Sequence, residues 1–458
     1  MISLTVKEVA SAVGAQEITD TWQKVKLDTV SFDTRKLVAG SLFVPLTGEK
    51  DGHDFIAQAI KNGAAASFWS RPIEEAPTDI PVIQVEDTLK ALQDLAKYVL
   101  KKVNPKVVGI TGSNGKTTTK DMTEAVLGTK YRVYKTQGNF NNHIGLPITI
   151  LEMPKETEVL ILEMGMNHAG EIKVLSDLAE PDIAIITMIG ESHIEYLGSR
   201  AGIATAKMEI ISGLKPEGVL IIPGEEPLLL ERTDSLEKKQ IKTFGTKTIN
   251  DLYPLTLDSQ MKETIFTTNL EPELMVTLPV LGTYNVTNAL AALSAELVLG
   301  ISLKEAAPGL AGFQLTKNRT EWMAAINGSM LLNDSYNANP TAMKAVLTNF
   351  SELAHKGRKI VVLGDMLELG EHSQALHISI KEALSADKID QVFLYGPEME
   401  ALHSALIKEF PKERLHYFTG EKEPMIQQLK QIIRPTDFIL VKSSLGTDLL
   451  SVVRALQA

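Results

Sequence analysis

The chain has 458 residues and contains no cysteine. This absence excludes disulfide bonds, thiol nucleophiles and zinc sites built on cysteine. Long hydrophobic runs are also missing, since no stretch approaches the roughly 18 uninterrupted apolar residues that a membrane-spanning helix needs. The N-terminus lacks a basic stretch followed by an apolar core, which is the pattern of a secretion signal. We therefore expect a cytoplasmic protein with no membrane insertion.

Positive charge is in short supply. The 46 Lys and Arg residues are outnumbered by 57 Asp and Glu residues, which gives a formal net charge of −11. Because nucleic-acid binding needs a basic face, nucleic acid is not expected as the main partner. An anionic ligand must instead meet local Lys, Arg and backbone donors. The length suggests about three domains, and we expect the chain to act as a monomer.

From residue 107 onward, short apolar runs alternate with helical patterns. Continuous apolar runs separated by helices are typical of a parallel sheet that is covered on both faces. We therefore expect an α/β protein with a small section at residues 1–105 and two parallel-sheet sections at 106–313 and 314–458. The expected strands are 107–111, 159–165, 183–190, 219–223, 330–334, 359–365, 391–396 and 438–444. Residues 224–280 are less periodic and predict a small β excursion, followed by an alanine-rich helix at 286–299.

The segment Val107–Lys120, VVGITGSNGKTTTK, is the most informative part of the chain. Its glycines let backbone N–H groups close around phosphate oxygens, and the N-terminus of the helix that follows adds positive potential. Lys116 can supply a cation to the β- and γ-phosphates, and Thr117 a hydroxyl ligand to Mg²⁺. The general phosphate-loop pattern has glycine where Ile110 stands, so a structural turn is the alternative reading. The combination nevertheless predicts nucleoside triphosphate binding by Gly112, Ser113, Asn114, Gly115, Lys116, Thr117 and Thr118.

Polar residues follow the next expected strands. In open parallel sheets, ligands bind beyond the carboxyl ends of the strands. Glu163 and His193 fall there, and they can converge on a Mg²⁺ ion beside Thr117. A lone Glu or His in such a place is more often a solvated loop residue or a helix cap, so the prediction depends on the neighbouring phosphate loop.

Lys207 shares a helical face with Ile203, Ile210 and Ile211. From the residues alone, the favoured reading is a lysine whose stem lies along an apolar face while its ammonium reaches water. The alternative is a desolvated lysine with a lowered pKa, which is reactive enough to be chemically modified.

Two further pairs are candidates for nucleotide contacts. Asn285 and Asn288 lie three residues apart near a helix start, where capping and base or ribose recognition are both open for Asn285. Arg319 and Asp334 flank the junction of the last two sections. Either is compatible with a routine ion pair, and together they could grip phosphate and ribose from across a cleft.

Near the N-terminus, residues 30–35 (VSFDTR) alternate strictly. Val30 and Phe32 are expected to face the core, and Ser31, Asp33 and Arg35 to share the opposite face. Such a face is usually just solvated. The glycine-containing loop that follows, with Thr47 and Gly48, adds donors that would suit a nucleotide diphosphate or a sugar.

At this point the sequence resembles the Mur ligases of bacterial cell-wall synthesis along essentially its whole length. The loop TGSNGKTTT is similar to that family's phosphate loop, which accounts for the departure at Ile110. Four other segments resemble the family member that adds the terminal dipeptide. They are SFDTR with GSLFVPLTGEKDGHDF, GNFNNHIGLP, NDSYNANP and GDMLELG, and the last two are the most specific.

The resemblance implies an ATP-dependent amide ligase that joins D-alanyl-D-alanine to UDP-N-acetylmuramoyl-tripeptide. It implies a UDP-sugar substrate domain at 1–105, a central P-loop ATPase domain at 106–313 and a Rossmann-like ligase domain at 314–458. Lys116, Glu163, His193 and Lys207 would be catalytic, with ATP and two Mg²⁺ ions held by Thr117, Glu163, His193 and a carbamylated Lys207. The nucleotide contacts would include Asn285, Asn288, Arg319, Asp334 and Asn337. The substrate contacts would be Ser31, Asp33, Arg35, Thr47, Gly48, Asn139 and Asn142.

One segment departs from the family pattern, because SSLGTDL at 443–449 stands where a Gly-Ser-Arg segment is expected. No residue is therefore assigned to the incoming dipeptide. The alternatives are a sister ligase of the folylpolyglutamate or cyanophycin type, an ATP-switched binding protein, and a small-molecule kinase. The sister ligases would not need a uridine-diphosphate domain, the switch would hydrolyse ATP without co-substrates, and the kinase would release no free phosphate.

Overall fold

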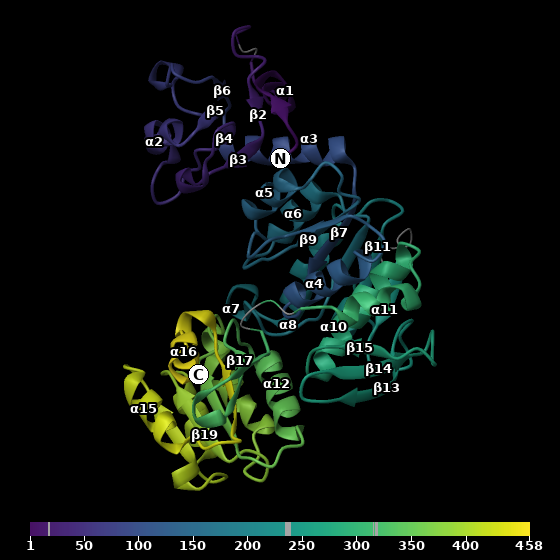
Figure 1. Cartoon of the computed structure of the whole chain (residues 1–458), viewed down its shortest axis with the longest axis vertical. Helices are drawn as coiled ribbons and strands as arrows, with labels where there is room; N and C mark the ends of the chain where they lie inside the picture. Colours follow the sequence, from purple (N-terminus) through teal and green to yellow (C-terminus); the bar gives the residue numbers. More distant parts are fainter. Residues whose placement is uncertain (17–18, 234–239, 315, 317–318) are drawn as a thin grey trace.

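The computed structural model describes residues 1–16, 19–233, 240–314, 316 and 319–458. The molecule is elongated, with three α/β parts that follow one another along the long axis in chain order (Figure 1). Among the described residues, no helix is both long and apolar enough to cross a membrane.

The first part holds two small sheets. Strand β1 (Leu4–Thr5) pairs antiparallel with β2 (Lys26–Leu27), and β3, β4, β5 and β6 form a parallel sheet in that order. These four strands are Thr29–Ser31, Ser41–Phe43, Ala64–Trp69 and Val82–Gln84. The helices are α1 (Val6–Ala12), α2 (Ile56–Lys61) and α3 (Thr88–Val103). Asn104 is the C-cap of α3, and its left-handed backbone (φ 56°) turns the chain into the central part.

The predicted six-residue alternation at residues 30–35 is wrong. Strand β3 ends at Ser31, and a 3-10 turn, η1 (Thr34–Lys36), follows it. Val30 is buried as predicted, but Phe32 is 38% exposed. The reason is local, because the Asp33 side chain accepts a hydrogen bond from the Arg35 N–H at 3.0 Å and so caps the turn. An aspartate that bonds to the backbone two residues on competes with an extended strand.

The central part is built on a six-stranded parallel sheet in the order β12-β11-β10-β7-β9-β8. Its strands are β7 (Lys106–Thr111), β8 (Val133–Lys135), β9 (Val159–Glu163), β10 (Ile183–Ile186), β11 (Val219–Pro223) and β12 (Gln240–Phe244). Its helices are α4 (Lys116–Leu127), α5 (Gly145–Glu152), α6 (Glu171–Ala179), α7 (Ile194–Leu197), α8 (Arg200–Met208) and α9 (Pro227–Leu230). Strand β10 ends four residues before the expected position, so that Thr187 and Met188 belong to the loop beyond the sheet.

The expected β excursion is present as an antiparallel sheet of β13 (Pro254–Ser259), β14 (Thr264–Thr268) and β15 (Val276–Leu278). Helices α10 (Thr283–Val298) and α11 (Leu303–Ala311) then return to the central sheet. Helix α10 begins three residues before the expected start, and it packs against α4 over a shared apolar core.

The last part has a second six-stranded sheet in the order β16-β17-β21-β18-β19-β20, parallel except for the β16–β17 pair. Its strands are β16 (Glu321–Ala324), β17 (Met330–Asp334), β18 (Lys359–Gly364), β19 (Gln391–Tyr395), β20 (Leu415–Phe418) and β21 (Phe438–Lys442). Its helices are α12 (Pro340–Glu352), α13 (Ser373–Ser379), α14 (Met399–Leu406), α15 (Glu423–Ile432) and α16 (Leu450–Leu456). The predicted α/β class is therefore confirmed, with a parallel sheet in each of the last two parts.

Short 3-10 turns complete the described structure. They are η2 (Gly52–Phe55), η3 (Ile73–Glu75), η4 (Glu209–Ile211), η5 (Ile326–Gly328), η6 (Gly370–His372), η7 (Ile380–Ala383), η8 (Lys412–Arg414) and η9 (Leu445–Thr447).

Candidate active site

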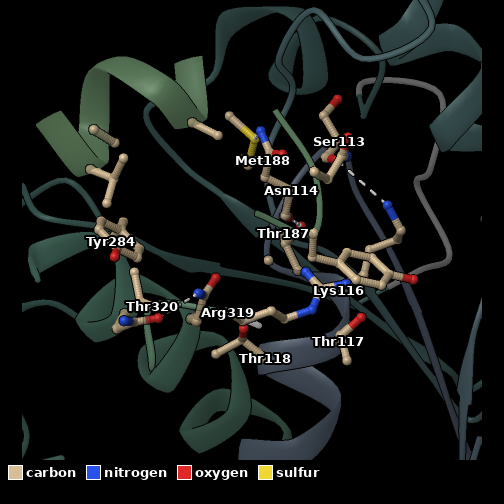
Figure 2. A pocket seen from close by; sticks show the side chains of 18 of the residues that line it. Ser113, Asn114, Lys116, Thr117, Thr118, Thr187, Met188, Tyr284, Arg319 and Thr320 are labelled. Carbon is tan, nitrogen blue, oxygen red and sulfur yellow. Dashed lines mark hydrogen bonds between the residues drawn. The ribbon is translucent and has the colours of Figure 1, made fainter. Parts of the chain in front are cut away.

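A cavity of about 360 Å³ lies where the central and last parts meet, beyond the carboxyl ends of β7 and β17. Figure 2 shows Ser113, Asn114, Lys116 and Thr117 on one side of it and Tyr284 and Thr320 on the other, with Arg319 reaching between them. The cavity brings together residues that are far apart in the sequence. Twelve of the residues that sequence reasoning singled out line it: Ser113, Asn114, Gly115, Lys116, Thr117, Thr118, Glu163, Asn285, Asn288, Arg319, Asp334 and Asn337.

The loop between β7 and α4 depends on two of its glycines. Gly112 (φ 153°) lies so close to Thr187 that a Cβ atom would stand 1.8 Å from the Thr187 Oγ1 atom. Gly115 (φ 78°) is the N-cap of α4, and a Cβ atom there would stand 2.4 Å from the Asn288 Oδ1 atom. Glycine is the residue that accepts both a left-handed backbone and such close approach. The loop therefore presents bare backbone at the N-terminus of a helix of twelve residues, an arrangement suited to phosphate.

Lys116 is the first residue of α4, and its side chain folds back over the loop. Its Nζ atom donates to the Gly112 carbonyl oxygen at 2.8 Å. Burial lowers the pKa of Lys116, the nearby Glu163 carboxylate opposes that shift, and Arg319 adds to it. The ammonium is thus held beside the loop by a backbone carbonyl, and the negative charge of Glu163 balances it only in part.

Glu163 closes β9 and points its carboxylate into the same cavity as Thr117. Its Oε1 atom accepts a hydrogen bond from the Asn141 Nδ2 atom at 2.9 Å. Its Oε2 atom is buried and has no hydrogen-bond partner among the described residues, although the Lys120 Nζ atom lies 3.8 Å away. A buried carboxylate oxygen left open beside a hydroxyl is the kind of donor that a Mg²⁺ ion takes.

His193 precedes α7 and lies close to this cavity but not in its lining. Burial, followed by the charges of Lys116 and Lys207, lowers the pKa of His193 to about 4. The imidazole is therefore neutral at pH 7, as a metal ligand must be. In the described part of the chain, no group of three or more His, Asp or Glu residues is already gathered as a metal site.

Lys207 lies on α8 and is 1% exposed. The expectation of a lysine that extends its ammonium to water is therefore wrong, because the whole side chain is buried. Burial, reinforced by the charge of Lys116, moves the pKa of Lys207 well below its usual range. This burial agrees with the alternative interpretation of the sequence, a desolvated lysine, and the chemical modification of Lys207 stays a prediction.

The two asparagines of α10 lie on the cavity wall. Asn285 does not cap the helix, since Gly282 is the N-cap and the Asn285 Nδ2 atom donates to the Leu281 carbonyl oxygen at 2.7 Å. Asn288 lies one turn further on, 3.4 Å from the Asn285 Oδ1 atom, and accepts from the Thr119 hydroxyl at the same distance. Helix α10 is thereby linked to the phosphate-loop helix.

Arg319 and Asp334 do not pair with each other by any contact that the structure records. The Arg319 guanidinium lies 4.2 Å from the centre of the Tyr336 ring, and Asp334 accepts from the Lys442 Nζ atom at 2.5 Å. Sequence reasoning missed Lys442 and Tyr336, both of which line the cavity. Lys442 is the last residue of β21, so the strand-end rule that found Glu163 could also have found it. Tyr336 lies within the NDSYNANP segment, where no spacing marks the ring.

The predicted substrate residues lie away from this cavity. Ser31, Asp33, Arg35, Thr47 and Gly48 belong to the first part of the chain. The Arg35 guanidinium, paired with Asp33 at 2.8 Å, lowers the pKa of that carboxyl to about 2. The Asn142 side chain accepts from the N–H of Gly145, the first residue of α5, at 2.8 Å and lines a separate hollow of about 230 Å³ beside α6, whereas Asn139 is exposed nearby.

The central and last parts also touch directly beside the cavity. Asn114 of the phosphate loop and Asn339 exchange hydrogen bonds through their amides, at 3.0 and 2.6 Å. The Thr341 hydroxyl donates to the Glu191 carboxylate at 2.7 Å. The first turn of α12 is therefore fastened to the phosphate loop and to the loop after β10.

Three family models match successive parts of the chain. They are described as Mur ligase family, catalytic domain, at residues 26–99; Mur ligase middle domain, at 110–295; and Mur ligase, glutamate ligase domain, at 318–445. The cavity is lined by residues from the last two of these ranges.

Curated relatives and solved structures match over nearly the full length. The UDP-N-acetylmuramoyl-tripeptide–D-alanyl-D-alanine ligase of Bacillus subtilis is 47% identical over 457 residues, which covers 100% of this chain and 99% of that protein. The ligase of the same name from Escherichia coli is 35% identical, with 100% and 99% covered. A crystal structure of MurF from Acinetobacter baumannii superposes with a TM-score of 0.89 at 31% identity, covering 99% and 98%. Since similarity of this extent runs from end to end and includes all three parts of the fold, the chain belongs to the Mur ligase family.

Proposed function

We propose that this chain is an ATP-dependent amide ligase that joins D-alanyl-D-alanine to UDP-N-acetylmuramoyl-tripeptide and releases ADP and phosphate. The observation that carries the proposal is the full-length match to ligases of that name, combined with a phosphate loop that opens into the cavity between the two parallel-sheet parts. A carboxylate is a poor electrophile at neutral pH. Transfer of the γ-phosphoryl group to it gives an acyl phosphate, which the amine of the dipeptide attacks to form the amide.

Within this reaction the phosphate loop positions the triphosphate. The bare N–H groups around Gly115 and the Lys116 ammonium face the place where negative charge gathers. Arg319 adds a second cation from the opposite wall. Such fixed charges stabilise the transition state of phosphoryl transfer without covalent chemistry of their own. The Asn285 and Asn288 amides, with Asp334 and Asn337, are available to the ribose and base.

The side chains present fit a magnesium site. Thr117 offers a hydroxyl, Glu163 a buried carboxylate oxygen without a partner among the described residues, and His193 a neutral imidazole. Bound Mg²⁺ would offset the charge of the phosphates and of the reacting carboxylate. We assign Thr117, Glu163 and His193 to this role, with two ions as the expected number.

We further propose that Lys207 is carbamylated. Burial lowers the pKa of Lys207 and so favours its neutral amine, which is the form that can attack carbon dioxide. The nitrogen–carbon bond forms, one oxygen takes the negative charge, and the amine proton leaves to water. The resulting carboxylate would lie near the Lys116 cation, and it would supply the oxygen ligand that a second ion needs.

Replacement of Lys207 by alanine tests the carbamate. The variant should be severely impaired in turnover and partly rescued by a short carboxylic acid that occupies the vacated space. Lys207→Met keeps the length and the burial, so it separates the charge from the packing. Full activity of Lys207→Ala without added acid would contradict the carbamate.

The first part of the chain is proposed to bind the uridine-diphosphate end of the substrate. Ser31 at the end of β3 and Asp33 and Arg35 at the η1 turn, with Thr47 and Gly48, offer hydroxyl, carboxylate, guanidinium and backbone groups. Asn139 and Asn142 would lie along the path to the nucleotide cavity. We place the domain boundaries near residues 105 and 313, and the reaction in the cytoplasm, where ATP is available.

Phosphate release tests the function directly. ATP and Mg²⁺ are supplied with UDP-N-acetylmuramoyl-tripeptide, with and without D-alanyl-D-alanine. Release that depends on both co-substrates, with a pentapeptide product by mass spectrometry, supports the ligase. Release that ignores the dipeptide, or ADP without free phosphate, would contradict it.

A further inference from the structure

We propose that Glu368 is a positioning residue for His193 that is supplied by the opposite domain. Its carboxylate faces the Nδ1 atom of the imidazole, and we infer that it holds the ring so that Nε2 is the nitrogen left for a metal ion. The inference rests on the proposed function, in which His193 is a magnesium ligand. It assigns a role to the GDMLELG segment (364–370), which has no part in the proposed reaction.

The contact joins two separate parts of the fold. The Glu368 Oε2 atom lies 2.5 Å from the His193 Nδ1 atom, although the ring N–H is not yet aligned with it as a hydrogen bond. Beside this pair, the Glu195 backbone N–H donates to the Glu368 carbonyl oxygen at 3.3 Å. Gly370 approaches so closely that a Cβ atom would stand 3.0 Å from the Glu195 side chain. In Figure 1, α7, which His193 precedes, lies where the central part borders the last part.

Both partners hold a backbone conformation that non-glycine residues rarely adopt. The φ angle is 65° at His193 and 62° at Glu368. Left-handed backbone at an ordinary residue costs free energy, and it persists where the surroundings enforce it, often at functional sites. Two such residues that face each other across a domain boundary indicate that the contact itself is maintained.

The chemistry of metal-bound histidine explains why a carboxylate belongs there. A ligating imidazole commonly gives its second N–H to a carboxylate, which fixes the tautomer and the ring orientation. Here that carboxylate comes from the last part of the chain, whereas the imidazole comes from the central part. The orientation of the ligand therefore depends on the docking of the two parts. Metal binding is completed only in the assembled molecule.

The test compares Glu368→Ala, Glu368→Gln and Glu368→Asp with Glu371→Ala. Glu371 is three residues away, and its side chain is 89% exposed, so Glu371→Ala should behave as the wild type. Glu368→Ala should lower kcat, and raise the Mg²⁺ concentration required, by about 10- to 100-fold. The KM for ATP should change little, and Glu368→Asp should restore part of the loss. Glu368→Gln keeps the size and shape of the side chain and removes only its charge, so it still tests the proposal if Glu368→Ala fails to fold.

A spectroscopic readout separates positioning from a general structural effect. Nitrogen-15 NMR of the histidine rings, with His193 assigned by a His193→Gln variant, reports which nitrogen carries the proton. The wild type should show the Nδ1–H tautomer, and Glu368→Ala should shift towards Nε2–H. Mn²⁺, used as a paramagnetic probe, should broaden the His193 signal in the wild type and do so more weakly in Glu368→Ala.

Two contrary outcomes are distinguishable. An unchanged tautomer in Glu368→Ala, with a normal response to Mn²⁺, would overturn the positioning role and leave the proposed function intact. A wild-type His193 signal that ignores Mn²⁺ would instead overturn the metal-ligand role, and with it the inference that depends on it.

Discussion

The side chain of Lys116 is a buried cation beside a backbone carbonyl, with an acidic group nearby that only partly balances it. Such a group is available to an incoming phosphate. We predict that Lys116→Ala lowers turnover by about 10³-fold or more, because transition-state charge loses its fixed counterpart. Phosphate release under saturating substrates is the measurement, and Lys130→Ala, at an exposed position, is the control. A near-normal rate would remove Lys116 from the site.

The buried Glu296 of α10 should make the stability of the protein depend on pH. Its side chain is 0% exposed, neither carboxylate oxygen has a hydrogen-bond partner among the described residues, and burial raises its pKa to about 9. The folded protein therefore keeps a proton that the unfolded chain loses above about pH 4.5. Stability should consequently fall as the pH rises from about 5 towards 9.

Urea unfolding at pH 5 and pH 8 measures this effect. Between these values the wild type should lose about 2 to 4 kcal/mol more than Glu296→Gln, which cannot ionise. Identical pH dependence in the two proteins would show that Glu296 is not held protonated.

Among individual residues, the sequence was sufficient to predict those that belong to a short motif or follow the end of a strand. Twelve predicted residues share one cavity because the phosphate loop and the strand ends meet at the same edges of two sheets. Phe32 was misplaced because a single aspartate ended the strand. Tyr336 was missed because the stacking of the Arg319 guanidinium on its ring corresponds to no spacing pattern in the sequence. The roles assigned to the individual site residues stay predictions.

Among the elements, the turn between β7 and α4 has the least tolerance for change. We predict that Gly112→Ala abolishes ATP binding, because the added methyl group would collide with the Thr187 hydroxyl. Isothermal titration with ATP and Mg²⁺ is the measurement, and circular dichroism checks that the chain stays folded. Gly420→Ala is the matched control, since Gly420 also has positive φ (78°) but has no atom within 4 Å of an added Cβ. Wild-type affinity in Gly112→Ala would show that the loop can yield.

The elements that sequence predicted best are the buried parallel strands. Expected strands at 219–223 and 330–334 match β11 and β17 residue for residue, since both faces of such strands are covered and the apolar run is continuous. Strand β12 was not identified, because it lies within the weakly periodic segment 224–280 and forms the edge of its sheet. The early end of β10 was also missed, because Ile189 continues the apolar run after the chain has left the sheet.

At the scale of the whole molecule, the cavity has one wall from the central part and one from the last part. We therefore predict that these two parts close around the substrates. Without ligands, the direct polar contacts between the two parts that we describe lie at Asn339, Thr341 and Glu368. We expect so small a set of contacts to let the last part sample open arrangements. Adding ATP and the tripeptide substrate should shrink the radius of gyration towards the value of the assembled structure and exclude water that would hydrolyse an acyl phosphate. Small-angle scattering measures this change. Profiles that are unchanged by both ligands would count against closure.

The division of the cavity between two domains has a thermodynamic consequence. A ligand that touches both walls binds the assembled form in preference to the open form. Ligand binding therefore stabilises the assembled form, and assembly strengthens ligand binding to the same extent. ATP would then act as a removable fastener as well as a phosphoryl donor. The ATP concentration would set the fraction of molecules in which the two-domain site is assembled. Depletion of ATP would therefore open the active site and also remove one of the substrates.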